Sequence, residues 1–457
     1  MINYFNFKQI SDDEFLITND FGAFSFVDKQ TLMNLVHNSL NKDSEKYNEL
    51  DEKGFILPSN VDEIFDKTTT RYRLAKNYLF GATSLHIFVL TNECNLNCRY
   101  CQAKDPTKHI PGKMDIETAE KAVDIALQSP EHKLNFEFQG GEPISNFDVL
   151  KHIYEYAEEH KGNHLISYSV VSNLTLMSDE MIRFLIENKI QIATSLDGPA
   201  KVHDFNRPFK SDKGSYDIVV NKIKRIKELG GTVGAIQTTT RQSLNYPREI
   251  IDEYRKLGFD NVFIRPLTKL GTALERWNEI GYTAEEFISF YKACLEYIIE
   301  LNKNGDMFRE GHVSIFSSKI INGCAQNYME LRSPCGAGIG QLAYYYNGDV
   351  FTCDEGRMLS EMGDNAFKLG NVYEKSYNDL MQSTVCKTMC ASSTLECLPS
   401  CAECVYQPYC GTCPVLNYAS EKNIFKRDAK GYRCSVYKGM LDVIFDLIWK
   451  HEFEVFC

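Results

Sequence analysis

The sequence predicts an α/β fold in which a partial barrel of six parallel strands carries a small N-terminal module and a cysteine-rich C-terminal part. Three observations support this prediction. Strand-like apolar runs alternate with helical stretches in the middle of the chain, two short strands and small helices precede them, and twelve of the sixteen cysteines lie from residue 324 onward. Because 457 residues suffice for two or three domains, we place the boundaries at 1–80, 81–310 and 311–457.

The first part, residues 1–80, contains two strand-like segments followed by small helices. The segment DEFLITN places Phe15 and Ile17 on one face, and AFSFVD continues after a turn with Phe24 and Phe26. The run TLMNLVHNSL has helical periodicity, and YNELDEKGF is closed by Gly54. These elements form a module of winged-helix size. Taken alone, the module is equally compatible with a simple cap on the next domain.

The second part repeats a strand and helix unit. Six apolar runs cover residues 85–91, 133–139, 166–172, 190–196, 232–238 and 261–267, and amphipathic stretches separate them. In one such stretch, Asp115 is a candidate N-cap before Ile116, Ala119 and Val123. Strict alternation implies a parallel sheet with right-handed crossovers. Six strands are too few for a closed eight-stranded barrel, so we expect an open or partial barrel with its chemistry at the carboxyl ends of the strands.

Composition excludes several classes of function. A net charge of −12 argues against a large nucleic-acid footprint, which requires a basic face. No apolar run reaches the length of a membrane span, and the N-terminus does not resemble a secretory signal. We therefore expect a cytoplasmic protein without nucleic-acid or membrane partners. In that compartment thiols stay reduced, which favours metal or cluster ligation over disulfides.

The segment TNECNLNCRYC places Cys94, Cys98 and Cys101 on the loop after the first barrel strand. The run from Gln139 to Pro143, QGGEP, follows the second strand in the same way. Three thiolates leave one open position on a tetrahedral metal or on a four-iron cluster. The nearest histidines, His86 and His109, lack the spacing of a zinc knuckle. An open iron is a position that a cofactor can chelate.

This pattern resembles the radical S-adenosylmethionine (SAM) enzymes. The resemblance implies that the three cysteines hold a [4Fe-4S] cluster, whose open iron binds SAM, and that reductive cleavage of SAM yields a 5′-deoxyadenosyl radical. Tyr100 matches the aromatic residue near the adenine, and Arg207 matches a residue that binds the methionine carboxylate. Asp197 is interpreted as a loop cap. The full set of SAM-binding residues implied by the resemblance is Tyr100, Gln139, Gly140, Gly141, Glu142, Asn173, Ser195 and Arg207.

The third part resembles the SPASM extension of peptide-modifying radical SAM enzymes, which holds two auxiliary [4Fe-4S] clusters. The resemblance implies three clusters in total and assigns the remaining ligands: Cys335, Cys353, Cys413 and Cys324 to the first auxiliary cluster, and Cys401, Cys404, Cys410 and Cys434 to the second. Two residues rather than three separate Cys410 from Cys413, which puts the assignment of Cys413 in doubt. If Cys324 is not a ligand, the first auxiliary cluster has an open iron.

Three further cysteines, Cys386, Cys390 and Cys397, have no place in the SPASM pattern and are interpreted as packing or surface thiols, with a role as an alternative ligand as the second interpretation. A zinc ribbon formed by the segment 401–413 is the alternative to an auxiliary cluster. Cys294, in the helical run FYKACLEYI, is expected to lie in the core.

The segments RSPCGAGIG, DEGRMLSEMGD and FKLGNV resemble the maturases of His-Xaa-Ser peptide systems, with the thioether-forming ranthipeptide maturases as neighbours. The resemblance implies a ribosomally made precursor peptide whose leader adds a strand to the N-terminal module. It also implies an external electron donor such as flavodoxin or ferredoxin. Asp354 would act as the base beside the first auxiliary cluster; the competing interpretation is that it only caps the turn or bonds to the backbone.

The expected reaction is an oxidative cross-link in the core peptide, with a cysteine thioether first and a carbon–carbon or carbon–oxygen cyclophane second. A sulfatase maturase that oxidises cysteine or serine is the enzymatic alternative. A cluster-binding regulator without turnover is the non-enzymatic alternative, and the SAM motifs argue against it.

Overall fold

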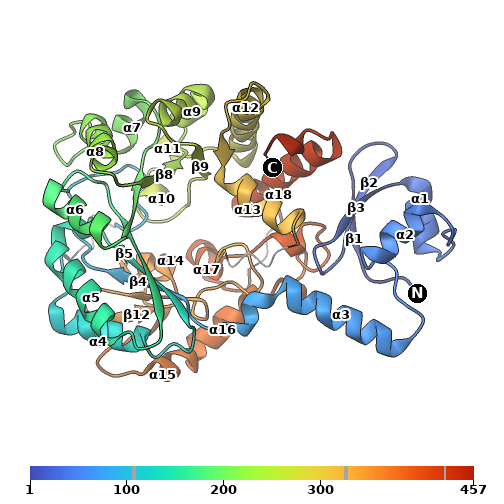
Figure 1. The fold of residues 1–457 in the computed structure, drawn as a ribbon, viewed down its shortest axis with the longest axis horizontal. Helices are drawn as coiled ribbons and strands as arrows, with labels where there is room; N and C mark the ends of the chain where they lie inside the picture. Colours follow the sequence, from blue (N-terminus) through green and yellow to red (C-terminus); the bar gives the residue numbers. More distant parts are fainter. Residues whose placement is uncertain (105–109, 324–327, 427–428, 457) are drawn as a thin grey trace.

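The structure is a computed structural model of residues 1–457 that describes every residue except 105–109, 324–327, 427–428 and 457 (Figure 1). Cys324 therefore lies outside the described residues. No helix in the described ranges is long and apolar enough to cross a membrane.

Six parallel strands form the centre of the molecule, as the sequence predicts. They are β4 (Leu85–Val89), β5 (Lys133–Gln139), β6 (Leu165–Val171), β7 (Gln191–Ser195), β8 (Val233–Thr238) and β9 (Asn261–Arg265), and they pair in chain order. Between and after them run the helices α4 (Ile116–Ala126), α5 (Phe147–His160), α6 (Asp179–Glu187), α7 (Ala200–Asn206), α8 (Tyr216–Glu228), α9 (Pro247–Lys256) and α12 (Ala284–Lys303). Figure 1 shows α4, α5, α6 and α8 on the outside of the curved sheet. The predicted α/β partial barrel is confirmed.

Local sequence explains why these elements form. On β5, Leu134, Phe136 and Phe138 are buried in the main core, whereas the residues between them are more accessible. This alternation matches the two-residue period of a strand. The side chain of Asp115 accepts a hydrogen bond from the Thr118 amide at 2.8 Å, so it caps α4 as predicted.

The sheet contains four more strands than the six that the sequence predicts. The strand β10 (Arg309–Glu310) pairs with β9, and β11 (Gln341–Tyr344) pairs in parallel with β4 on the other edge. The strands β12 (Asp349–Phe351) and β13 (Lys368–Asn371) then continue antiparallel. These four strands are short, and β11 is buried along its whole length, so none has an alternating pattern. The cysteine-rich part thereby shares one sheet with the barrel.

The N-terminal module has three antiparallel strands rather than the two expected: β1 (Asn6–Gln9), β2 (Glu14–Thr18) and β3 (Phe24–Asp28). The sequence NFKQ of β1 lacks a clear apolar alternation, and its pairing with β2 defines it as a strand. The helices α1 (Lys29–Val36) and α2 (Glu45–Glu52) follow. Ile17 and Val27 pack in a small core of the module itself, whereas Leu16 belongs to the main core of the molecule. The two faces of β2 therefore pack in different cores.

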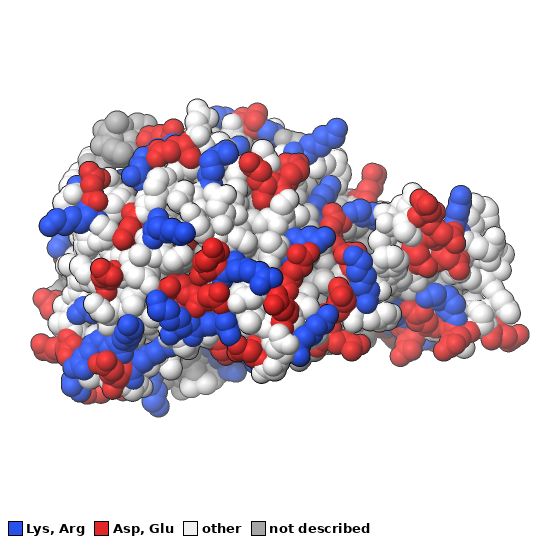
Figure 2. All heavy atoms as spheres, turned by 90° about the horizontal axis from the view of Figure 1, so that it is seen from above, with Lys and Arg blue, Asp and Glu red and all other residues white. Residues whose placement is uncertain are grey.

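The module lies against the C-terminal helix α18 (Tyr432–Trp449), and helix α3 (Val61–Ala75) connects it to the barrel (Figure 1). The ring of Phe24 packs edge-on against that of Phe445 on α18, with centroids 5.5 Å apart. On the face drawn in Figure 2, lysine and arginine side chains are interspersed with aspartate and glutamate, without a large basic area.

Candidate active site

The first cysteine group, Cys94, Cys98 and Cys101, lies on the loop that follows the carboxyl end of β4. Burial raises the pKa of the Cys94 and Cys98 thiols to about 11, and the pKa of Cys101 is raised for the same reason. Each of these thiols also raises the pKa of a neighbour in the group, so the three lie close together. Buried thiolates require a nearby cation, and iron is a cation that such a set of soft donors fits.

The glycines of the QGGEP run allow the loop after β5 to lie directly against the cysteine loop. A Cβ atom on Gly140 would lie 2.4 Å from the Thr91 carbonyl oxygen, and one on Gly141 would lie 2.3 Å from that of Glu93. The Gly141 amide donates to the Thr91 carbonyl and the Glu142 amide to the Glu93 carbonyl, both at 2.8 Å. The two loops are thus joined by backbone hydrogen bonds that any side chain would disrupt.

Glu142 connects the carboxyl ends of β5 and β6 near the cysteine loop. Its buried carboxylate accepts hydrogen bonds from the Ser172 hydroxyl and the Asn173 amide, each at 2.7 Å. Burial raises the pKa of Glu142, although these hydrogen bonds oppose the shift. The Asn173 side chain donates to Asn95 Oδ1 at 2.9 Å and lies 3.7 Å from Cys94 Sγ. Glu142 and Asn173, both predicted SAM-binding residues, therefore join the ends of β5 and β6 to the cysteine loop.

Tyr100, Arg207 and Asp197 form a second polar connection at this end of the barrel. The Tyr100 hydroxyl donates to Asp197 at 2.8 Å, and Arg207 Nη1 donates to Tyr100 Oη at 2.5 Å. Burial by itself lowers the pKa of Arg207, but Cys98, Tyr100 and Asp197 raise it well above its ordinary value. The guanidinium cation therefore stands beside the first cysteine group.

Asp197 does more than cap a loop, which the sequence interpretation missed. It is fully buried and also accepts hydrogen bonds from Asn206 Nδ2 at 3.0 Å and from the Thr238 amide at 3.2 Å. Asp197 lies two residues after the end of β7. Because functional residues of such folds gather at the carboxyl ends of the strands, this position could have marked Asp197 as a site residue. Ser195 is the half-buried last residue of β7, and Gln139 donates its amide to Glu137 on β5.

The second cysteine group, Cys335, Cys353 and Cys413, is brought together from three distant segments. Cys335 and Cys353 are buried in a small core with Met389, and Cys413 packs against it. Burial raises the pKa of all three thiols, and their mutual proximity raises that of Cys353 and Cys413 further. The structure thus places Cys413 with Cys335 and Cys353 despite the short spacing after Cys410.

The third cysteine group consists of Cys401, Cys404, Cys410 and Cys434. Burial raises the pKa of the Cys410 thiol to about 12, with smaller contributions from the other three thiols. All four cysteines line a cavity of about 330 Å³ together with Arg433 and Tyr437. Among the described residues, no set of three or more His, Cys, Asp or Glu side chains is already arranged to hold a metal ion.

Asp354 opens helix α14 (Asp354–Ser360), directly after Cys353. Its carboxylate forms an ion pair with the buried Arg357 one turn later. Burial raises the pKa of Glu137, an inward-facing residue of β5, and the charge of Asp354 contributes to that shift. Asp354 is therefore close enough to the barrel strands to influence their carboxylates.

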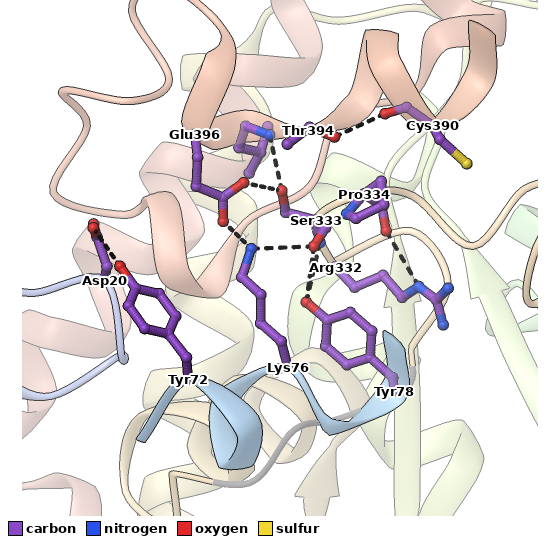
Figure 3. A network of polar contacts seen from close by, with 11 residues as sticks. Asp20, Tyr72, Lys76, Tyr78, Arg332, Ser333, Pro334, Cys390, Thr394 and Glu396 are labelled. Carbon is purple, nitrogen blue, oxygen red and sulfur yellow. Dashed lines mark hydrogen bonds and ion pairs between the residues drawn. The ribbon is translucent and has the colours of Figure 1, made fainter. Parts of the chain in front are cut away.

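Figure 3 shows the contacts between the segment that follows α3 and the loop at Ser333 and Pro334. Lys76 forms an ion pair with Glu396, whose carboxylate accepts a hydrogen bond from the Ser333 hydroxyl at 2.6 Å. The Tyr78 hydroxyl donates to the Ser333 carbonyl at 3.2 Å. Cys335 follows two residues later, so this network ends beside the second cysteine group.

The cysteines outside the three groups differ from one another in burial and in their contacts. Cys294 is fully buried on α12, as predicted. Cys386 and Cys390 interact across one turn of α16 (Thr384–Ser393), with a hydrogen bond from Cys386 that lowers the pKa of Cys390 to about 7. Cys397 is exposed.

Comparison with known proteins identifies relatives over most of the chain. An uncharacterised protein of Methanocaldococcus jannaschii is 30% identical over 294 residues, which cover 63% of this chain and 92% of that protein. The serine-type anaerobic sulfatase-maturating enzyme of Bacteroides thetaiotaomicron is 25% identical over 375 residues, covering 75% of this chain and 85% of the enzyme.

Two solved structures have a similar fold. Native anSMEcpe with bound AdoMet matches with a TM-score of 0.71 at 20% identity, over 82% of this chain and 100% of that one. Streptococcus suis SuiB bound to its precursor peptide SuiA matches with a TM-score of 0.57 at 16% identity, over 94% of this chain and 99% of that one.

Residues 88–241 match the family model of the radical SAM superfamily, whose members use a [4Fe-4S] cluster and SAM. This range contains the first cysteine group, the QGGEP run and Arg207. Together with the relative in M. jannaschii, the match establishes that this chain belongs to the radical SAM superfamily of enzymes.

Proposed function

We propose that this chain is a peptide maturase that binds a precursor peptide through its leader and installs an oxidative cross-link, most simply a cysteine thioether. The observation that carries the proposal is the combination of three cysteine groups and a three-stranded N-terminal module in one chain. The fold similarity to SuiB covers 94% of this chain, whereas the similarity to anSMEcpe covers 82%.

The first cysteine group would hold a [4Fe-4S] cluster, and SAM bound there would supply a radical that removes a hydrogen atom from the peptide. Arg207 is suited to bind the SAM carboxylate, because its charge is already held beside the cysteines. Glu142 and Asn173 would keep the strand ends and the cysteine loop in register. The two glycines allow the close backbone approach that this arrangement requires.

The second and third cysteine groups would hold two auxiliary [4Fe-4S] clusters. A thioether requires loss of two hydrogens from the peptide: one leaves as a hydrogen atom to the SAM-derived radical, and the other as a thiol proton. The remaining electron would leave through the auxiliary clusters to an external acceptor. Asp354, held by Arg357 next to Cys353, is the candidate base for the thiol proton.

The N-terminal module would capture the leader by strand addition. In the described residues, β1 and β3 each pair only with β2, so each offers one edge to an added strand. A leader bound there would leave the core peptide free to reach the open side of the barrel. Sulfatase maturation, named for the relative in B. thetaiotaomicron, is the second candidate.

The test is an anaerobic turnover experiment with enzyme reconstituted with iron and sulfide, reductant, SAM and the precursor peptide encoded beside the gene. We expect 5′-deoxyadenosine together with a peptide that is about 2 Da lighter and has one cysteine less open to alkylation. A 2 Da loss with all cysteines alkylatable would move the bond to carbon or oxygen. If the enzyme instead oxidises a cysteine or serine side chain in a short peptide that lacks a leader, sulfatase maturation would be favoured.

A further inference from the structure

We infer that the N-terminal module is a structural part of the third cysteine site, with Asn6 and Thr18 as positioning residues for the loop that carries Cys401 and Cys404. This inference rests on the proposed auxiliary cluster at that site. It adds a role for the module that is separate from leader binding, because it concerns the face of the small sheet that points toward the body of the molecule.

The contacts are made by side chains of the module and backbone carbonyls of the cysteine loop. Asn6 Nδ2 donates to the carbonyls of Ala402 at 3.1 Å and Cys404 at 3.3 Å. Thr18 Oγ1 donates to the carbonyl of Val405 at 2.7 Å. Three backbone carbonyls within residues 402–405 thus accept hydrogen bonds from side chains nearly four hundred residues away in sequence.

Both side chains are buried, which makes their hydrogen bonds specific. Asn6 is 7% exposed and Thr18 is fully buried, while Val405 is 5% exposed on the other side of the interface. A carbonyl that loses its donor in such a place cannot be compensated by bulk water. The loop would then relax toward another conformation, and the cysteines on it would move.

Neighbouring contacts hold the same surfaces together. Lys8 forms an ion pair with Asp442 on α18 and donates to the Tyr406 hydroxyl at 3.2 Å. The Tyr409 hydroxyl donates to the Gly22 carbonyl at 2.9 Å. Tyr406 and Tyr409 lie between Cys404 and Cys410, so the module contacts the loop along most of its length.

Residues that orient metal ligands without touching the metal commonly change metal affinity by about 10- to 100-fold when they are replaced. Asn6 and Thr18 hold the backbone of ligand residues rather than their side chains. We therefore expect effects at the lower end of that range, about tenfold in the rate at which iron leaves the third site.

The test uses a full-length chain in which Cys94, Cys98 and Cys101 are replaced by alanine, so that only auxiliary clusters bind iron. This parent chain should contain about eight iron atoms. Asn6→Ala with Thr18→Val should accelerate release of about four of them to a chelator by about tenfold and shift the midpoint potential of one cluster. Thr18→Ser in a chain that retains Asn6 keeps the hydroxyl and should behave as the parent.

The matched control is Asn3→Ala with Ser25→Ala. These side chains also donate within the module, Asn3 to the Gly54 carbonyl at 2.9 Å and Ser25 to Glu49 at 2.7 Å, but neither of these bonds reaches the cysteine loop. Equal chelation rates and equal potentials in test and control variants would overturn the inference. If the double variant unfolds, Thr18→Val alone keeps the side-chain volume and gives the same comparison. A parent chain that binds no iron would instead refute the proposed auxiliary clusters, independently of Asn6 and Thr18.

Discussion

Arg207 lies with its guanidinium carbon 5.7 Å from the centre of the Tyr100 ring and donates a hydrogen bond to the Tyr100 hydroxyl, 107 residues away in sequence. Tyr100 in turn donates to Asp197. The chain thereby holds a cation beside the loop of the first cysteine group, at the position where a SAM carboxylate is expected.

Replacement of Arg207 should weaken SAM binding. We expect Arg207→Met to raise the dissociation constant by about 10- to 100-fold, because a charge-assisted hydrogen bond contributes about 1.5–3 kcal/mol. Calorimetric titration of the reconstituted enzyme with SAM measures it. The exposed Arg183→Met is the matched control. Unchanged affinity in Arg207→Met with a full complement of iron would exclude Arg207 as a SAM ligand.

Replacement of Gly141 should disrupt the first cysteine loop. In Gly141→Ala the new Cβ would lie 2.3 Å from the Glu93 carbonyl oxygen, so either loop must move. We expect loss of about four iron atoms per chain and of SAM cleavage. Gly234→Ala is the control, since a Cβ on Gly234 meets no atom within 4 Å. Equal iron contents in the two variants would show that the close approach of the loops is not required.

Replacement of Asp354 separates its two possible roles. If its carboxylate accepts the thiol proton, Asp354→Asn should slow the change in peptide mass by about 100-fold while 5′-deoxyadenosine still forms. The exposed Asp252→Asn should leave both unchanged. A variant that forms cross-linked peptide at the parent rate would leave Asp354 with only its ion pair to Arg357.

The buried His86 should make stability depend on pH. Burial lowers the pKa of His86 from its ordinary value to about 3. Between pH 6.5 and 3 the unfolded chain therefore binds a proton that the folded chain does not, and stability falls as the pH falls through this window, by up to about 1.4 kcal/mol per pH unit.

The measurement is the thermal unfolding midpoint at pH 7.5 and pH 5.5. His86→Gln should show a smaller difference between the two conditions than the parent, whereas the exposed His132→Gln should match the parent. An undiminished difference in His86→Gln would mean that other groups cause the pH dependence.

Much of the fold could be predicted because it is encoded locally. The alternation of Leu134, Phe136 and Phe138 defines β5 without reference to any other segment, and Asp115 caps α4 within one turn. The strands β1, β10 and β11 could not be found in this way. They become strands only because a neighbouring strand supplies hydrogen bonds, as β4 does for β11.

The sequence by itself determined the superfamily, the six-stranded parallel core and the first cysteine group, because Cys94, Cys98 and Cys101 lie within eight residues and their spacing is part of the chain. Only the tertiary structure decided which distant residues meet. It placed Cys413 with Cys335 and Cys353, made buried Asp197 the partner of Tyr100, and set Asn6 and Thr18 against the loop of Cys404. These contacts depend on how the packed faces of separate elements come together, and no local pattern records that.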